Sequence, residues 1–243
     1  MLRSMVLTAL GVALVAGLVL SAVQALHVSP IIYAAEVFEI AEPEVVAALN
    51  DGHSHSHVNA NGEAAWSPED GLERIGYTVL SNVLSSFGFA MILLACMFMA
   101  RDKAQLNISW FKGVVWGLAG YVTFFVVPAL GLSPEIPSME AAALDGRQSW
   151  WVLAVVATGL AIFSLVFLPG IAKLVAIVFI AAPWFVGAPQ PEVHGFMHPD
   201  TQAVATLEGL QVQFIYATAI ANGVFWITLG GLTGYCAKRF IKA

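Results

Sequence analysis

The composition of this 243-residue chain excludes a water-soluble globular domain. Only 11% of the residues are charged and 59% are hydrophobic, whereas about a quarter of a soluble domain is charged. The formal net charge is −6, and we expect no nucleic-acid partner. Apolar residues occur in runs of about 20, the length that crosses a bilayer as a helix. We therefore predict an all-α, polytopic bundle of transmembrane helices in a lipid bilayer.

Six transmembrane spans are predicted, in one transmembrane domain that comprises residues 1–243. They cover residues 5–28, 75–100, 113–132, 150–168, 171–187 and 212–235. The fourth and fifth are separated only by Pro169 and Gly170, which end one helix and allow a tight reversal. The first also resembles a secretory signal, whose removal would leave five spans. Its apolar stretch continues to Val28, beyond the ~7–15 residues usual for a signal, so we favour a retained helix.

The basic residues predict the orientation of the chain. With the N-terminus inside, all but two of the ten lysines and arginines lie on the inner side, the exceptions being Arg74 and Arg147. Positive residues near helix ends stay in the cytoplasm, so both termini are predicted to lie inside. All six histidines, and every acidic residue except Asp102, then lie outside. Such an outer surface attracts cations.

The first outer segment, residues 29–74, is too long for a simple connection. Within residues 30–49, Glu36, Glu39 and Glu42 recur every three residues beside an apolar stripe. This pattern predicts a short amphipathic helix that lies on the outer surface and ends at Pro43. Its glutamates are either simply solvated or, together with His27, form a face that collects cations.

Histidines alternate with other residues at positions 53, 55 and 57 of the same segment. Neutral imidazole binds divalent zinc, nickel, copper and cobalt, so His53, His55 and His57 on one tether can surround a single ion. The alternative is a polar linker that binds metal only incidentally.

The third outer loop, residues 188–211, offers a second set of ligands. His194 and His198 lie four residues apart, close to Glu192, Met197 and Asp200. A glycine and a proline in this stretch argue against a regular helix, so the spacing is equally consistent with metal binding and with an ordinary loop.

The spans contain few polar residues, and none has a charge at its centre. Gln24, Asn82, Gln213 and Asn222 either form hydrogen bonds between helices or line a polar path. At the outer rim, Arg147 is placed to pair with Glu135 of its own loop. We find no nucleotide-binding glycine loop, nucleophile elbow or HExxH motif, and we expect no enzymatic activity.

Four motifs spread over most of the chain carry a family resemblance. They are Ala35-Glu36-Val37-Phe38-Glu39, Trp66-Ser67-Pro68-Glu69-Asp70-Gly71, Pro134-Glu135-Ile136-Pro137 and Arg147-Gln148-Ser149-Trp150-Trp151. Together they resemble the predicted cobalt transporter subunit CbtA. The resemblance implies a multi-pass protein of the bacterial inner membrane that supplies cobalt for cobalamin synthesis. It also implies a partner, CbtB, which is a small single-span protein with a histidine-rich terminus.

We therefore expect a subunit of a divalent metal permease, with cobalt as the substrate and nickel or zinc as alternatives. Metal would be captured outside and then pass inward. A non-transporting membrane scaffold, or a partner protein that buffers or senses metal, is the alternative. The expected metal ligands are His27, Glu36, Glu39, His53, His55, His57, His194 and His198. The expected polar path comprises Gln24, Glu135, Arg147, Gln148, Gln213 and Asn222.

Metal capture by the outer histidines should weaken as the pH falls from about 7 toward about 5, because free imidazole has a pKa of ~6.5 and a protonated ring does not bind metal. Titration of the purified chain with Co²⁺ across this range measures the effect. An affinity that does not change with pH would assign the binding to carboxylates instead.

Overall fold

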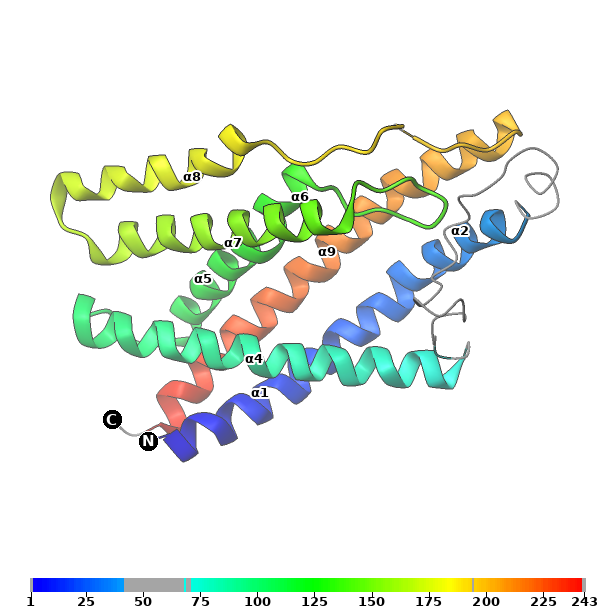
Figure 1. Cartoon of the computed structure of the whole chain (residues 1–243). Coiled ribbons are helices and arrows are strands. Elements are labelled where there is room, and N and C mark those ends of the chain that lie inside the picture. The colour runs from blue at the N-terminus through cyan, green and yellow to red at the C-terminus, as the bar shows by residue number, and fades with distance from the viewer. Residues whose placement is uncertain (1, 42–67, 69–70, 194, 242–243) are drawn as a thin grey trace, which may run out of the picture.

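The computed structural model describes residues 2–41, 68, 71–193 and 195–241. The described secondary structure is helical, apart from one antiparallel bridge between Met139 and Phe196. The helices, in chain order, are α1 (Leu2–Val23), η1 (Gln24–Val28), α2 (Ser29–Ala41), α4 (Leu72–Ala104), α5 (Trp110–Tyr121), η2 (Val122–Val126), α6 (Val127–Gly131), α7 (Leu144–Phe167), η3 (Gly170–Leu174), α8 (Val175–Val186) and α9 (Thr201–Phe240) (Figure 1).

Among the described residues, five helices are long and apolar enough to cross a membrane. They are Leu2–Phe38, Leu72–Ala104, Trp110–Gly131, Leu144–Phe167 and Thr201–Phe240. This confirms the predicted all-helical membrane protein. The fifth predicted span, residues 171–187, is instead a shorter apolar helix in which the 3₁₀ turn η3 precedes α8. The 12 residues of α8 rise only about 18 Å, less than the ~30 Å of a hydrocarbon core.

Helices α1, α4, α5, α7, α8 and α9 alternate in direction, so their connections gather toward two ends of the bundle (Figure 1). We call one the basic end, because the end of α4, with Arg101 and Lys103, the start of α5, with Lys112, and η3, with Lys173, lie there together with both chain termini. The other, the acidic end, contains the start of α4, the loop 132–143 and the segment 187–200. The sequence predicts that the acidic end faces outward.

The first helix is longer than the sequence predicts. A separate surface helix was expected within residues 30–49, but α2 instead continues α1 through η1, a turn of π-helix. The apolar stripe of α2 explains the difference, because it packs on the protein core rather than on the membrane surface. Ala35 is fully buried, and Ile31 and Phe38 pack against the same core. Pro30 has no N–H, and it follows a wide turn in which the Ser29 N–H donates to the Gln24 carbonyl.

Helices α5 and α9 make the closest backbone contact. Gly113 and Gly117 of α5 lie against Gly230 and Gly234 of α9, and a Cβ atom on Gly117 would approach the Trp226 carbonyl oxygen to 2.2 Å. In lipid, helices associate largely through such packing between small residues. Because α9 also packs against α1 and α4, this contact holds the centre of the bundle together.

Replacing Gly117 with alanine should destabilise the fold by about 1–3 kcal/mol, because the added methyl group must push the Trp226 backbone away. Thermal unfolding of the purified protein in detergent measures the loss. The control is Gly88→Ala in α4, where a Cβ atom would meet nothing within 4 Å. Equal stability of the two variants would contradict the close contact.

Candidate functional site

A cavity lined by both polar and apolar side chains lies between the first helix and α4, toward the acidic end. Its volume is about 260 Å³, and η1 forms part of its wall. Turns of π-helix are rare and are often found at functional sites. The polar side chains that line the cavity are Ser21, Gln24, Ser29, Tyr33, Arg74 and Thr78.

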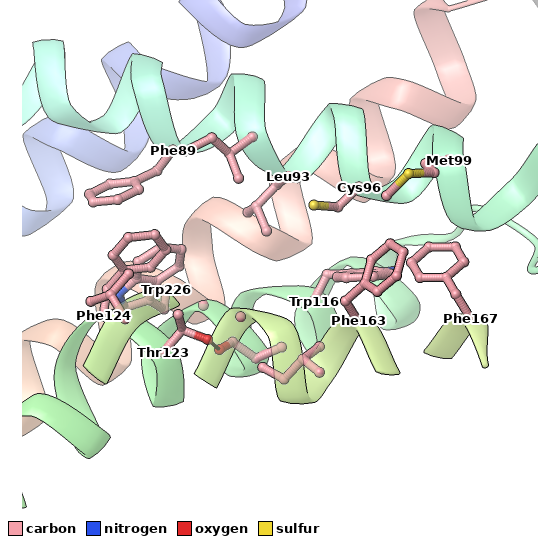
Figure 2. A pocket seen from close by; sticks show the side chains of 16 residues that line it. Phe89, Leu93, Cys96, Met99, Trp116, Thr123, Phe124, Phe163, Phe167 and Trp226 are labelled. Atoms are coloured by element: carbon pink, nitrogen blue, oxygen red, sulfur yellow. Dashed lines mark hydrogen bonds between the residues drawn. The ribbon is translucent and has the colours of Figure 1, made fainter. Parts of the chain in front are cut away.

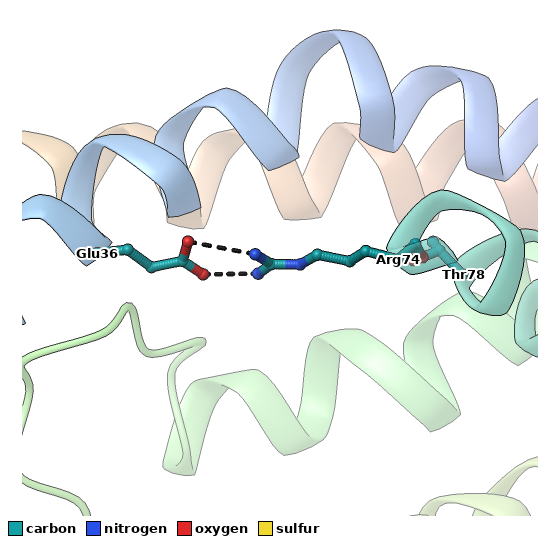
Figure 3. Close-up of polar contacts among 3 residues, drawn as sticks. All are labelled: Glu36, Arg74 and Thr78. Carbon is teal, nitrogen blue, oxygen red and sulfur yellow. Dashed lines mark hydrogen bonds and ion pairs between the residues drawn. The ribbon is translucent and has the colours of Figure 1, made fainter. Parts of the chain in front are cut away.

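An ion pair between Arg74 and Glu36 joins the two helices beyond the cavity, on the side of the acidic end. Arg74 Nη2 lies 2.6 Å from Glu36 Oε1, and Nη1 lies 3.2 Å from Oε2 (Figure 3). The guanidinium carbon also lies 4.9 Å from the centre of the Tyr33 ring, at the distance of a cation–π contact. The two charged side chains are 30% and 29% exposed. Solvent and ions can therefore reach this pair.

A neutral hydrogen-bond network joins the same two helices on the other side of the cavity. Asn82 Nδ2 donates to Gln24 Oε1 at 2.6 Å and to Ser21 Oγ at 3.0 Å. Close packing accompanies these bonds, since a Cβ atom on Gly17 would lie 2.7 Å from the Val83 Cα atom. Gln24 and Asn82 thus form the hydrogen bond between helices that was one of the two interpretations of their sequence positions.

The structure places few of the predicted metal ligands near one another. His27 is exposed on η1 and does not line the cavity, whereas Glu36 is in the ion pair. His198 lies in the loop before α9, where its ring packs edge-on against Phe38 with centroids 6.2 Å apart.

The remaining predicted ligands are only partly described or not described. Glu39 belongs to α2, but its side chain lies outside the described part, as do His53, His55, His57 and His194. Among the described residues, no group of three or more histidine, cysteine, aspartate or glutamate side chains is placed to hold a metal ion.

The residues of the predicted polar path lie in different surroundings. Arg147 Nη2 lies 2.8 Å from Glu135 Oε2, so the expected ion pair is present. Gln148 and Gln213 are exposed. The amide of Asn222 donates to the Thr218 carbonyl of its own helix. Of this predicted set, Gln24 alone lines the cavity.

Sequence reasoning did not select Ser21, Ser29, Tyr33 or Thr78 as site residues. A signal for the α4 side was present, because Arg74, Thr78, Asn82 and Ser86 recur every four residues. Residues with this spacing share one face of a helix. The structure turns this face toward the first helix, where it forms the polar side of the interface.

A second cavity, also of about 260 Å³, is lined almost wholly by apolar side chains of α4, α5, α7 and α9. Figure 2 shows Phe89, Phe124, Phe163 and Phe167 around it. The hydroxyl of Thr123, which also lines it, donates to the Ala119 carbonyl of its own helix. Because a cation loses its hydration at high cost in such surroundings, this cavity does not suit an ion.

The five long apolar helices define a multi-pass membrane protein, with a cavity of mixed lining toward one end. A family model described as "Probable cobalt transporter subunit (CbtA)" matches residues 2–238. The chain therefore belongs to the CbtA family, which confirms the resemblance carried by its motifs. No match was found among curated proteins or among solved structures.

Replacing Asn82 with leucine should destabilise the protein by about 1 kcal/mol, because it breaks two hydrogen bonds between helices. The side-chain amide oxygen of Gln24 then loses the donor that it has in Asn82. Thermal unfolding in detergent measures the change. Asn222→Leu is the matched control, since that amide bonds only within its own helix, and a smaller loss is expected. If the control is equally destabilised, the hydrogen bonds of Asn82 to the first helix do not contribute to stability.

Proposed function

We propose that this protein is the membrane subunit of a divalent-cation uptake system of the bacterial inner membrane, with Co²⁺ as its substrate and cobalamin synthesis as the destination of the metal. Membership of the CbtA family over residues 2–238 is the observation that carries the proposal. The cavity toward the acidic end is consistent with it, because a few side-chain oxygens line it on the side from which metal would arrive.

Capture would begin at the predicted outer surface, where carboxylates concentrate cations and imidazoles bind them. Oxygen atoms of the Gln24 amide and of the Ser29 and Thr78 hydroxyls, which line the cavity, would be the next groups that an ion meets. A membrane potential of ~100 mV, negative inside, favours inward movement of a divalent ion by roughly 4–5 kcal/mol. The proposed import therefore needs no nucleotide site on this chain.

A partner subunit would complete the path toward the basic end. Beyond Ser86, the buried residues of α4 are apolar, among them Ala90, Leu94 and Met97. The facing part of α1 buries Val12 and other small apolar residues. A small single-span subunit with a histidine-rich terminus, of the CbtB kind, fits this requirement because its own side chains could supply the missing ligands.

The apolar inner half of this interface also favours the alternative, a membrane protein that holds metal without moving it. In that case the outer residues would buffer or sense metal and pass it to another protein. Binding of Co²⁺ is common to both functions, so only a measurement of flux separates them.

Proteoliposomes that contain the purified chain together with its small partner should accumulate Co²⁺, and more strongly when the interior is made negative, because the potential acts on both charges of the ion. Metal trapped inside the vesicles is the quantity measured. Vesicles without protein, and vesicles with each subunit alone, are the controls. Binding without uptake in every arrangement would contradict the permease and favour the buffering protein.

A further inference from the structure

The second cavity lies between α7 and the helices α4, α5 and α9, and it extends toward the basic end. Figure 2 shows Phe89 and Phe124 at one end of it, and Met99 and Phe167 at the other, where α4 and α7 approach their last residues. From Phe89 to Met99 the helix rises about 15 Å, which is half of the ~30 Å hydrocarbon core of a membrane. The cavity therefore has about the depth of one leaflet of the bilayer.

The cavity is accessible from the side, between α4 and α7. Ile92 and Met99 of α4 and Phe163 of α7 line it, and all three side chains are exposed. In a membrane, exposed apolar side chains at this depth face lipid hydrocarbon rather than water. A lipid chain can therefore enter the cavity from the bilayer without crossing the protein core.

The volume and lining of the cavity suit a hydrocarbon chain. The hydroxyl of Thr123 donates to the Ala119 carbonyl at 2.8 Å, so it is satisfied within its own helix. Apolar cavities of about 150 Å³ already bind benzene, and this cavity measures about 260 Å³. It is too small for a helix, since one helical turn with its side chains is about 10 Å across and fills roughly 400 Å³. The occupant that fits is a single flexible chain.

Three lysines lie around the end of the cavity that is nearest the basic end. Lys103 follows the lining residue Met99 by four residues on α4, and Lys112 precedes the lining residue Trp116 by four residues on α5. Residues four apart share one face of a helix, so each lysine continues a face that lines the cavity. Lys173 lies in η3, within the turn that follows α7.

The positive charges of these lysines are not neutralised by the described residues. None of the three forms an ion pair within the described part of the chain, where Asp102 pairs instead with Arg101 at 2.8 Å. The apolar cavity thus ends beside uncompensated positive charge. Basic pockets between transmembrane helices on the cytoplasmic side bind anionic lipid headgroups, and the basic end is the one predicted to face the cytoplasm.

We propose that the cavity is a binding site for an anionic phospholipid of the leaflet at the basic end. One acyl chain fills the cavity, and Lys103, Lys112 and Lys173 attract the phosphate of the headgroup. The bound chain contacts α7 on one side and α4 and α5 on the other, so it joins the α7–α8 pair to the rest of the bundle. This inference does not depend on the proposed function.

The experiment titrates the purified full chain in detergent with phosphatidylglycerol or with phosphatidylcholine of the same acyl chains. The reporter is Cys96, which lines the cavity and is alkylated by an apolar maleimide in a Cys236→Ala background. Phosphatidylglycerol at ten times its Kd should slow the alkylation about tenfold, because the bound chain covers the thiol. Phosphatidylcholine should require a concentration roughly fivefold higher or more, because the lysines do not attract its neutral headgroup.

Replacing the three lysines with glutamine tests the headgroup site. This variant should bind the two lipids with equal affinity. The matched control combines Arg3→Gln, Lys238→Gln and Arg239→Gln, which change the net charge equally. Arg3 belongs to α1, which contributes no residue to the described lining, and the other two follow Trp226 of α9 by about three turns. The control should keep its preference for phosphatidylglycerol.

Gly159→Phe tests the acyl-chain site. Gly159 lines the cavity, and a Cβ atom there would meet nothing within 4 Å, so an added ring has room to enter it. Native mass spectrometry should show the loss of bound phosphatidylglycerol, while thermal unfolding without lipid shows that the protein stays folded. Gly88→Phe is the matched control, at an open position of α4 outside the cavity, and it should keep the lipid.

The proposal is overturned if phosphatidylglycerol leaves the alkylation of Cys96 unchanged, or if the two lipids protect it equally. It is also overturned if the control with three substitutions loses the preference as fully as the lysine variant, or if Gly159→Phe retains the lipid. Protection of Cys96 by the small partner subunit, with none from lipid, would assign the cavity to a helix instead.

Discussion

The pairing of α4 with the first helix is the interaction on which the site depends. In a bilayer, a polar side chain is stable only if it finds a partner within the protein, because lipid offers none. The polar face of α4 meets this requirement by turning toward α1 and α2, where Asn82 bonds to Gln24 and Arg74 to Glu36. Satisfying these groups brings the two helices into register, and the cavity lies between the two links.

The two basic residues predicted on the outer side both form ion pairs with glutamates. Arg74 pairs with Glu36, and Arg147 pairs with Glu135. Each pair is neutral, so the negative charge that the sequence predicts for the outer side comes from the other carboxylates.

The other described helices pack closely against one another. Glycines allow α5 and α9 to touch, and Trp226 fills the core beside them, where it stacks on Phe124. The second cavity is lined largely by aromatic and aliphatic side chains and offers a cation almost no polar ligand. The family description is that of a probable transporter subunit.

The sequence by itself determined the helical membrane class, five of the predicted spans, the family and the Arg147–Glu135 pair, because hydropathy, charge and local motifs act over short distances. Only the tertiary structure decided that α2 extends the first helix, that 171–187 forms a shorter helix, and that Gln24 faces Asn82 while Gln213 is exposed. Composition places a polar residue within a span, but the face that it presents to a neighbour depends on how whole helices rotate and pack. That choice is made by contacts between residues far apart in the chain, such as Ser21 with Asn82 and Gly117 with Trp226.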